Sequence, residues 1–127
     1  MSREKILVIE DTPVNMELVT DLLEVAGYKV IQAETAETGI ERARAEAPDL
    51  ILMDIGLPGM DGLTAAGILK QDQLTKDIPI IALTSHAMKD DDERIMAAGC
   101  DGYITKPIDT REFPKRVASF IGSTGKD

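Results

Sequence analysis

The stretch Leu50-Ile51-Leu52-Met53-Asp54 decides the fold class of this chain. Four consecutive apolar side chains run without a polar interruption, and a carboxylate follows them at once. A strand with one wet face would alternate apolar and polar residues, so the unbroken run indicates a strand that is buried on both faces. Strands of this kind occur in parallel sheets that helices cover from both sides. The stretch therefore predicts an α/β protein.

Apolar runs of strand length alternate with segments of helical period on both sides of this stretch. The expected strands cover 6–9, 28–31, 50–53, 78–83 and 102–104, and the expected helices cover about 13–26, 36–47, 63–70, 89–98 and 109–121. A β-α order repeated five times predicts a three-layer, doubly wound (βα)5 fold of the flavodoxin-like type. Its five-stranded parallel sheet has right-handed crossovers. The strand order, 2-1-3-4-5, is taken from known doubly wound folds.

Proline and glycine mark several expected helix ends. Thr12 followed by Pro13 is typical of an N-cap and a first helical residue, and Gly27 is a good stop. Pro114 lies near the start of the last helix. If that helix begins at Asp109, Pro114 removes a main-chain hydrogen bond and kinks the helix or delays its start.

The length and composition suit one domain. The chain has 127 residues, of which 43% are hydrophobic and 29% charged, and its composition is that of an ordinary globular protein. It contains no linker, internal repeat or low-complexity tract. We therefore expect a single domain over residues 1–127, with a core of about 5–121 and a polar tail at 122–127.

Charge and cysteine content narrow the classes of partner and compartment. The formal net charge is -9, which repels nucleic acid, and no basic run offsets it. Cys100 is the only cysteine, which excludes an intrachain disulfide and fits a reducing cytoplasm. The sequence has no signal-peptide core and no apolar run long enough to span a bilayer. We expect a cytoplasmic protein without direct nucleic-acid binding or membrane insertion.

Polar side chains stand where four of the expected strands end. Glu10 and Asp11 follow the first strand, Asp54 the third and Thr84 the fourth, and Lys106 lies just past the fifth. In an open parallel sheet, ligands bind outside the carboxyl ends of the strands, where the strand order reverses. Each residue alone could be an ordinary turn or surface residue. Together they predict one site at this edge of the sheet.

Three carboxylates at one site repel each other and require a counter-charge. Mg2+ prefers oxygen ligands and keeps several waters, so one or two carboxylates suit it. We expect Asp11 and Asp54 to be direct ligands and Glu10 to act through water. The backbone carbonyl of Gly56 could add a further oxygen.

The same site suits transfer of a phosphoryl group. Asp54 can act as the nucleophile, because carboxylates attack phosphorus to give an acyl phosphate. The cation, Lys106 and the Thr84 hydroxyl would neutralise and hold the phosphoryl oxygens. Other sites are disfavoured, since the chain has no Walker-type or Rossmann glycine loop and too few His and Cys for a closed zinc site. Ser85 and His86 are chain neighbours, which is poor geometry for a nucleophile and its base.

At this point the sequence resembles the response-regulator receiver family, the CheY-like proteins. The resemblance covers roughly residues 5–121. It rests on the acidic pair Glu10-Asp11 after the run at 6–9 and on the segments 48–54, 57–62, 79–84 and 102–107.

The resemblance implies a role for each site residue. Asp54 corresponds to the phospho-acceptor, Glu10 and Asp11 to the Mg2+ acids, Thr84 to the switch hydroxyl and Lys106 to the lysine that contacts phosphate. It also implies that Ser85 adjoins the phosphoryl group, that Tyr103 is the aromatic switch residue and that the Lys106–Pro107 bond is cis.

The resemblance further implies a phosphohistidine donor, on a sensor histidine kinase or a histidine phosphotransfer protein. Phosphorylation would draw Thr84 inward and Tyr103 after it, and so remodel the face of the fourth helix, fifth strand and fifth helix for a downstream protein. The chain would then be a switch and not an enzyme. We expect a monomer, and the sequence leaves open whether activation causes dimerisation.

Some residues bear on the subgroup and on the phosphoryl lifetime. The segments Glu10-Asp11-Thr12, Asn15-Met16 and Ala87-Met88-Lys89 resemble DivK-like stand-alone receivers. Gly56 and Ser85 depart from the commonest family pattern, and Gly56 has no side chain to shield the phosphoryl group. Two other functions stay open: a phosphorylation-independent adaptor, and an Mg2+-dependent phosphohydrolase, whose usual Asp-x-Asp motif the chain lacks.

Overall fold

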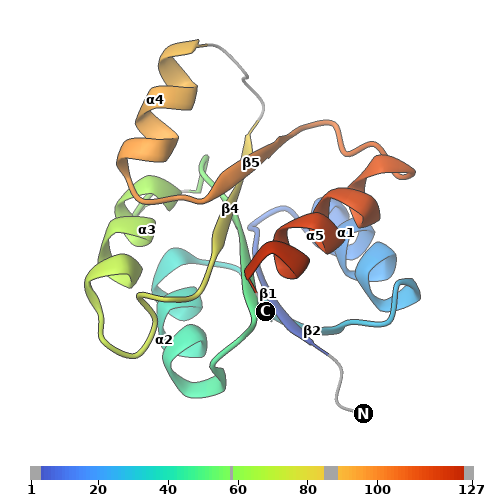
Figure 1. Cartoon of the computed structure of the whole chain (residues 1–127), viewed down its shortest axis with the longest axis horizontal. Helices are drawn as coiled ribbons and strands as arrows, with labels where there is room; N and C mark the ends of the chain where they lie inside the picture. Colours follow the sequence, from blue (N-terminus) through green and yellow to red (C-terminus); the bar gives the residue numbers. More distant parts are fainter. Residues whose placement is uncertain (1–3, 58, 85–88, 125–127) are drawn as a thin grey trace.

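Five strands and five helices alternate along the chain and form three layers (Figure 1). The computed structural model describes residues 4–57, 59–84 and 89–124. The strands are β1 (Lys5–Ile9), β2 (Lys29–Ala33), β3 (Leu50–Asp54), β4 (Ile80–Thr84) and β5 (Gly102–Thr105). The helices are α1 (Pro13–Val25), α2 (Ala36–Glu46), α3 (Gly62–Gln71), α4 (Lys89–Ala97) and α5 (Glu112–Thr124).

The sheet has the predicted architecture. Its strands lie in the order β2-β1-β3-β4-β5, and every pair is parallel. In the register, Ile9 of β1 lies opposite Met53 of β3, and Asp54 lies opposite Leu83 of β4. The carboxyl ends of these central strands therefore meet at one edge of the sheet, which confirms the fold class and the strand order.

Helices cover both faces of the sheet because its strands are apolar on both sides. Helices α1 and α5 lie against one face, and α2, α3 and α4 lie against the other (Figure 1). Along β1, Ile6 and Val8 belong to the apolar cluster under α1 and α5, whereas Leu7 and Ile9 belong to the cluster on the opposite side. All four side chains are fully buried.

Two strands begin later than predicted. The second strand starts at Lys29 and extends to Ala33. The fourth starts at Ile80, because Ile78 belongs to the preceding turn, where its amide donates to the Thr75 carbonyl at 3.0 Å. The following residue, Pro79, has no N–H to donate to a ladder. Ile78, which the apolar run assigns to the strand, therefore closes the preceding turn.

The last helix begins at Glu112, so Pro114 lies in its first turn. The amides of a first turn need no partner within the helix, and a proline there breaks no hydrogen bond. Asp109 precedes the helix, and its carboxylate accepts hydrogen bonds from the amides of Arg111 and Glu112 at 2.9 and 3.2 Å. Of the two outcomes considered for Pro114, the delayed start is the one observed.

Residues Thr12 and Pro13 take the predicted positions at the start of α1, but no side-chain hydrogen bond caps this helix. The Thr12 amide instead donates to the Glu10 carboxylate at 3.1 Å. The start of α1 is therefore tied to an acidic residue at the edge of the sheet. Within the described part of the chain, no helix has both the length and the apolar character needed to cross a membrane.

Two glycines of α3 provide a matched test of packing. A Cβ atom added to Gly62 would lie 2.5 Å from the carbonyl oxygen of Asp54 and 2.7 Å from the Ile55 Cα, whereas one added to Gly67 would meet nothing within 4 Å. We expect Gly62→Ala to lower the free energy of unfolding by about 1–3 kcal/mol, because backbone must shift. Gly67→Ala should raise it by about 0.5–1 kcal/mol through helix propensity. Urea unfolding measures both, and equal effects would contradict the close approach of α3 to β3.

Candidate functional site

The polar residues predicted for the site lie at one edge of the sheet. Asp54 and Thr84 are the last residues of β3 and β4, and Glu10 directly follows β1. Since β1 and β3 are neighbours, Glu10 and Asp54 come together although 44 positions separate them in the sequence. One carboxylate oxygen from each of Glu10, Asp11 and Asp54 lies within 4.8 Å of the others.

The Lys106 ammonium joins two of these acids. Its Nζ atom lies 3.1 Å from Glu10 Oε1 and 3.1 Å from Asp54 Oδ2. Burial by itself acts to lower the pKa of Lys106, but the hydrogen bonds to Glu10 and Asp54 outweigh burial and raise it. Lys106 therefore stays charged, and it holds the segment after β5 against the ends of β1 and β3.

Glu10 is the most deeply buried acid of the site, with 1% of its surface exposed. Burial raises the pKa of its carboxyl, and the nearby Asp54 carboxylate raises it further. Hydrogen bonds from the Thr12 amide and from Lys106 oppose this shift. A buried acid with these two partners is suited to positioning other groups of the site.

The two oxygens of Asp54 have different partners. Oδ1 accepts a hydrogen bond from the Gly56 amide at 2.9 Å, and Oδ2 faces the Lys106 ammonium. These contacts fix the carboxylate at the end of β3. The third acid, Asp11, is exposed.

The structure describes some of the remaining predicted residues and not others. Thr84 is 1% exposed and lies opposite Thr105 of β5, and its carbonyl accepts from the Lys106 amide at 2.7 Å. The Lys106–Pro107 bond is cis, as expected. Tyr103 is half-buried against the cluster under α2, α3 and α4. The residues Ser85, His86, Ala87 and Met88 lie outside the described part of the chain.

Sequence reasoning missed the contributions of the main chain. It assigned Gly56 a carbonyl ligand, which stays a prediction, whereas the contact seen is the hydrogen bond from the Gly56 amide to Asp54. It also did not foresee the bond from the Thr12 amide to Glu10. Every residue except proline has an amide, so no residue type marked these two donors.

The acids have a charge and a donor set that suit a divalent cation. Three carboxylates and one ammonium leave a formal charge of two negative units. The donor atoms are all oxygen, which hard cations such as Mg2+ prefer. The arrangement therefore combines a cation-binding cluster with a fixed carboxylate that can act as a nucleophile.

Replacement of Lys106 tests the electrostatics of the site. In Lys106→Met, Glu10 and Asp54 lose their shared counter-charge, and we expect the free energy of unfolding at pH 7 in EDTA to fall by about 1–3 kcal/mol. The pKa of Glu10 should rise further above its unfolded value. The variant therefore loses stability as the pH increases from the unfolded pKa of Glu10 to the raised pKa in the folded state. Its deficit against wild type should therefore shrink toward pH 4.5, the ordinary pKa of Glu10.

Urea unfolding at several pH values measures this deficit. The matched control is Lys115→Met, which makes the same change at an exposed position of α5. A deficit that is independent of pH, or equal in the two variants, would contradict the counter-charge role of Lys106.

Comparison with known proteins adds independent findings. The family model of the response regulator receiver domain matches residues 6–118. The polar-differentiation response regulator DivK of Brucella ovis is 42% identical over 119 residues, which cover 94% of this chain and 97% of that protein. The predicted similarity to DivK is thus confirmed.

Solved structures agree with this result. The receiver domain of a sensor histidine kinase from Pseudomonas aeruginosa, with magnesium coordinated in its active-site cleft, has a TM-score of 0.87 and 32% identity and covers 95% of this chain and 99% of its own. A CheY-like receiver protein from Methanospirillum hungatei has a TM-score of 0.89 and 28% identity, with 97% of each chain covered. The chain belongs to the response regulator receiver domain family of two-component signalling proteins.

Proposed function

We propose that this chain is a phospho-acceptor switch in which Asp54 takes a phosphoryl group with the help of Mg2+. The observation that carries the proposal is the position of the Lys106 ammonium, 3.1 Å from both Asp54 and Glu10, beside a cluster of three acids. The three acids of this site favour binding of a divalent cation, and the ammonium favours binding of a phosphoryl group.

Glu10, Asp11 and Asp54 are the residues that would hold Mg2+, with Asp11 and Asp54 as direct ligands, Glu10 acting through water and the Gly56 carbonyl as a further oxygen. Bound there, the cation would neutralise charge on the equatorial phosphoryl oxygens. The relative from Pseudomonas aeruginosa, which has magnesium in its cleft, supports this choice of metal.

The chain's own residues position the transfer. An Asp54 carboxylate oxygen forms the new O–P bond while the N–P bond of a phosphohistidine donor breaks, and the imidazole leaves with the bonding electron pair. The Gly56 amide orients the Asp54 carboxylate from its Oδ1 side. The Lys106 ammonium would offset charge on the phosphoryl group, and we propose that the hydroxyls of Thr84 and Ser85 donate to it.

The output would pass from Thr84 to Tyr103. The two residues lie on neighbouring strands, β4 and β5, and Tyr103 is only partly buried. The Tyr103 carbonyl also accepts a hydrogen bond from Arg116 of α5 at 2.9 Å. A shift of Tyr103 would thus reach the surface of α4, β5 and α5, where we propose that a downstream protein binds.

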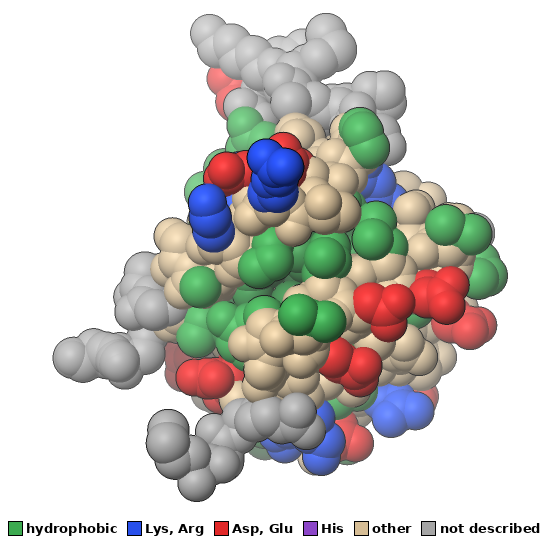
Figure 2. Space-filling view, turned by 90° about the vertical axis from the view of Figure 1, so that its right-hand side faces the viewer, with side chains coloured by type: hydrophobic (Ala, Val, Ile, Leu, Met, Phe, Trp, Pro, Cys, Tyr) green, Lys and Arg blue, Asp and Glu red, His purple; other side chains and the backbone are tan. Residues whose placement is uncertain are grey.

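The donor would dock on the face formed by α1 and α5. Figure 2 shows apolar side chains gathered on this face, with acidic side chains beside them. Leu22 of α1 and Ile121 of α5 are only partly buried there. Glu17, Asp21 and Glu24 of α1 are exposed at a spacing that places them in one stripe, and α1 contains no lysine or arginine.

An apolar surface with a basic rim on the donor would match this face. Because α1 begins next to Asp11, such a donor would bring its phosphohistidine toward Asp54. We propose that the donor is a sensor histidine kinase or a histidine phosphotransfer protein. We also propose that the chain is a cytoplasmic monomer that phosphorylation could dimerise.

Phosphorylation of Asp54 is tested directly with acetyl phosphate, a donor that needs no docking surface. With Mg2+, the intact mass of the wild type should increase by one phosphoryl group, and Asp54→Asn should gain none. Removal of Mg2+ with EDTA should abolish the gain. If wild type gains no mass, and does not bind beryllofluoride in its place while its fold is intact, the chain would instead be a phosphorylation-independent adaptor.

The same experiment addresses the second alternative. A phosphohydrolase would turn over added phosphoesters many times, whereas a switch that is not an enzyme would at most hydrolyse its own acyl phosphate. Sustained release of phosphate from a generic phosphoester would therefore favour the hydrolase.

The donor surface is tested by comparing two kinds of donor. In Asp21→Lys, the reversed charge should slow transfer from a phosphorylated histidine kinase or phosphotransfer protein by about tenfold, while acetyl phosphate labels the variant at the wild-type rate. Glu93→Lys on α4, another exposed acid, is the matched control. Equal slowing of both donors, or no slowing of the protein donor, would contradict docking at α1.

A further inference from the structure

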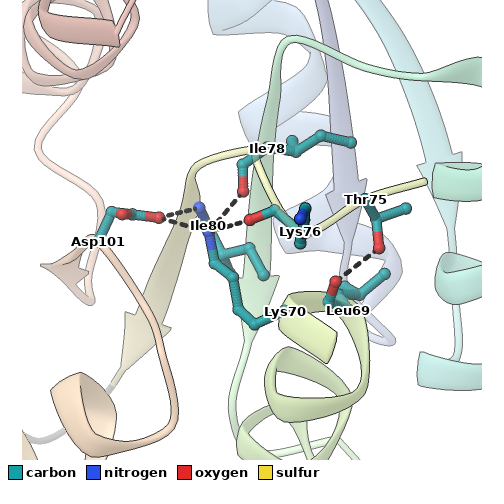
Figure 3. A network of polar contacts seen from close by, with 7 residues as sticks. All are labelled: Leu69, Lys70, Thr75, Lys76, Ile78, Ile80 and Asp101. Carbon is teal, nitrogen blue, oxygen red and sulfur yellow. Dashed lines mark hydrogen bonds and ion pairs between the residues drawn. The ribbon is translucent and has the colours of Figure 1, made fainter. Parts of the chain in front are cut away.

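A second polar network lies at the end of the sheet opposite to the phosphorylation site. It consists of Lys70 at the end of α3, Ile78 in the α3–β4 turn, Ile80 at the start of β4 and Asp101 just before β5 (Figure 3). We call these four residues the Lys70–Asp101 clamp. None of them takes part in the proposed phosphorylation chemistry.

Hydrogen bonds join the parts of the clamp. Lys70 Nζ donates to the Ile78 carbonyl at 2.8 Å and to Asp101 Oδ2 at 3.1 Å. The same Asp101 oxygen accepts from the Ile80 amide at 2.9 Å, and the Asp101 amide donates to the Ile80 carbonyl at 2.7 Å. Asp101 and Ile80 are thus paired by main-chain and side-chain bonds where β4 and β5 begin.

The surroundings hold the clamp in place. Thr75 is fully buried, and its hydroxyl donates to the Leu69 carbonyl at 2.6 Å, which fixes the turn that carries Ile78 (Figure 3). The stem of Lys70 lies close to Gly99, because a Cβ atom on this glycine would be 2.9 Å from Lys70 Cγ. Gly99 has a φ of +101°, which favours glycine, so the turn after α4 can pass this close to Lys70.

Helix α4 ends next to the clamp. Of its described side chains, at 93–97, only Ile95 is buried, and Met96 is 52% exposed. The amides of Gly99 and Cys100 donate back to the carbonyls of Met96 and Ile95, and Asp101 follows directly. Asp101 of the clamp therefore lies just beyond the C-terminal end of a helix that buries one side chain, Ile95, among those described at 93–97.

We propose that the Lys70–Asp101 clamp is the fixed pivot of the switch. It holds the beginnings of β4 and β5 in register and anchors the C-terminal end of α4, so that main-chain changes are confined to the part of these strands beyond it, from Tyr103, which lies opposite Ala82, to Thr84 at the end of β4. This inference rests on the proposed function, since a pivot needs a moving end.

The physical reason is that bonds to charged groups resist local opening more than neutral ones. Without the clamp, a displacement at the ends of β4 and β5 could be absorbed by sliding of their beginnings. With it, the displacement is transmitted to the exposed surface of α4 and β5. Lys70 and Asp101 are then positioning residues that touch neither Mg2+ nor the phosphoryl group.

The test uses amide NMR spectra of the full chain with and without beryllofluoride and Mg2+. In wild type, the added ligand should move the signals of Thr84 and Tyr103 and leave those of Ile80 and Asp101 in place. In Lys70→Met, which keeps the stem but removes the ammonium, the signals of Ile80 and Asp101 should move too. The response of Tyr103 should fall at least about twofold.

Two further variants make the test specific. Lys76→Met removes the same charge from the α3–β4 turn. The Lys76 carbonyl accepts from Lys70 Nζ at 3.4 Å, but in the described residues the Lys76 ammonium has no hydrogen bond or ion pair, so the spectra of this variant should respond as wild type does. Asp101→Asn keeps an oxygen acceptor for the Ile80 amide and removes the ion pair, and it should reproduce the effect of Lys70→Met. It also serves if Lys70→Met does not fold.

Three results would overturn the pivot. In the first, Ile80 and Asp101 of wild type respond as strongly as Thr84 and Tyr103. In the second, Lys70→Met and Asp101→Asn exchange their amide hydrogens faster than wild type but keep its full Tyr103 response, which would make the clamp a purely structural contact. In the third, wild type responds nowhere, and the proposed function fails together with the pivot.

Discussion

The contact of the Lys106 ammonium with Glu10 and Asp54 is the interaction on which the site depends. It joins residues that are 96 and 52 positions apart in the sequence. Two buried carboxylates side by side would repel each other, and the lysine makes their proximity tolerable. Its charge is in turn maintained by them, because their hydrogen bonds raise its pKa against the effect of burial. Glu10, Asp54 and Lys106 therefore stabilise one another at this edge of the sheet.

The sheet makes this contact possible. Glu10 and Asp54 come together because β1 and β3 are adjacent strands. The segment after β5 crosses the end of β4, where the Lys106 amide donates to the Thr84 carbonyl, and so brings Lys106 to both acids. The helix that follows the site is equally constrained, since α3 starts at Gly62 in close contact with the main chain of Asp54. Main-chain groups complete the arrangement, with the Gly56 amide on Asp54 and the Thr12 amide on Glu10. The site is thus a property of the sheet edge as a whole.

The two ends of the β4–β5 pair differ in a way that suits a switch. At one end, Thr84 closes β4 beside β3, whose last residue is Asp54, and the half-buried Tyr103 lies on β5 opposite Ala82 in the middle of β4. At the other end, Lys70 and Asp101 tie both strands to α3 and to the turn after α4. Strands held at one end transmit a displacement of the other end to their neighbours, and α4, in which Ile95 is the one buried side chain among those described at 93–97, is a neighbour that can respond.

The sequence by itself determined the alternation of strands and helices, the buried character of β3 and the set of acids, hydroxyl and lysine at the strand ends. These features follow from the identity and spacing of side chains that are close together in the sequence. Tertiary structure alone decided where β4 begins, how Pro114 fits α5, that the Gly56 and Thr12 amides bind the site acids, and that Lys70 reaches Asp101. Such features depend on main-chain groups common to all residues and on contacts between distant segments, and no local pattern of side chains encodes them.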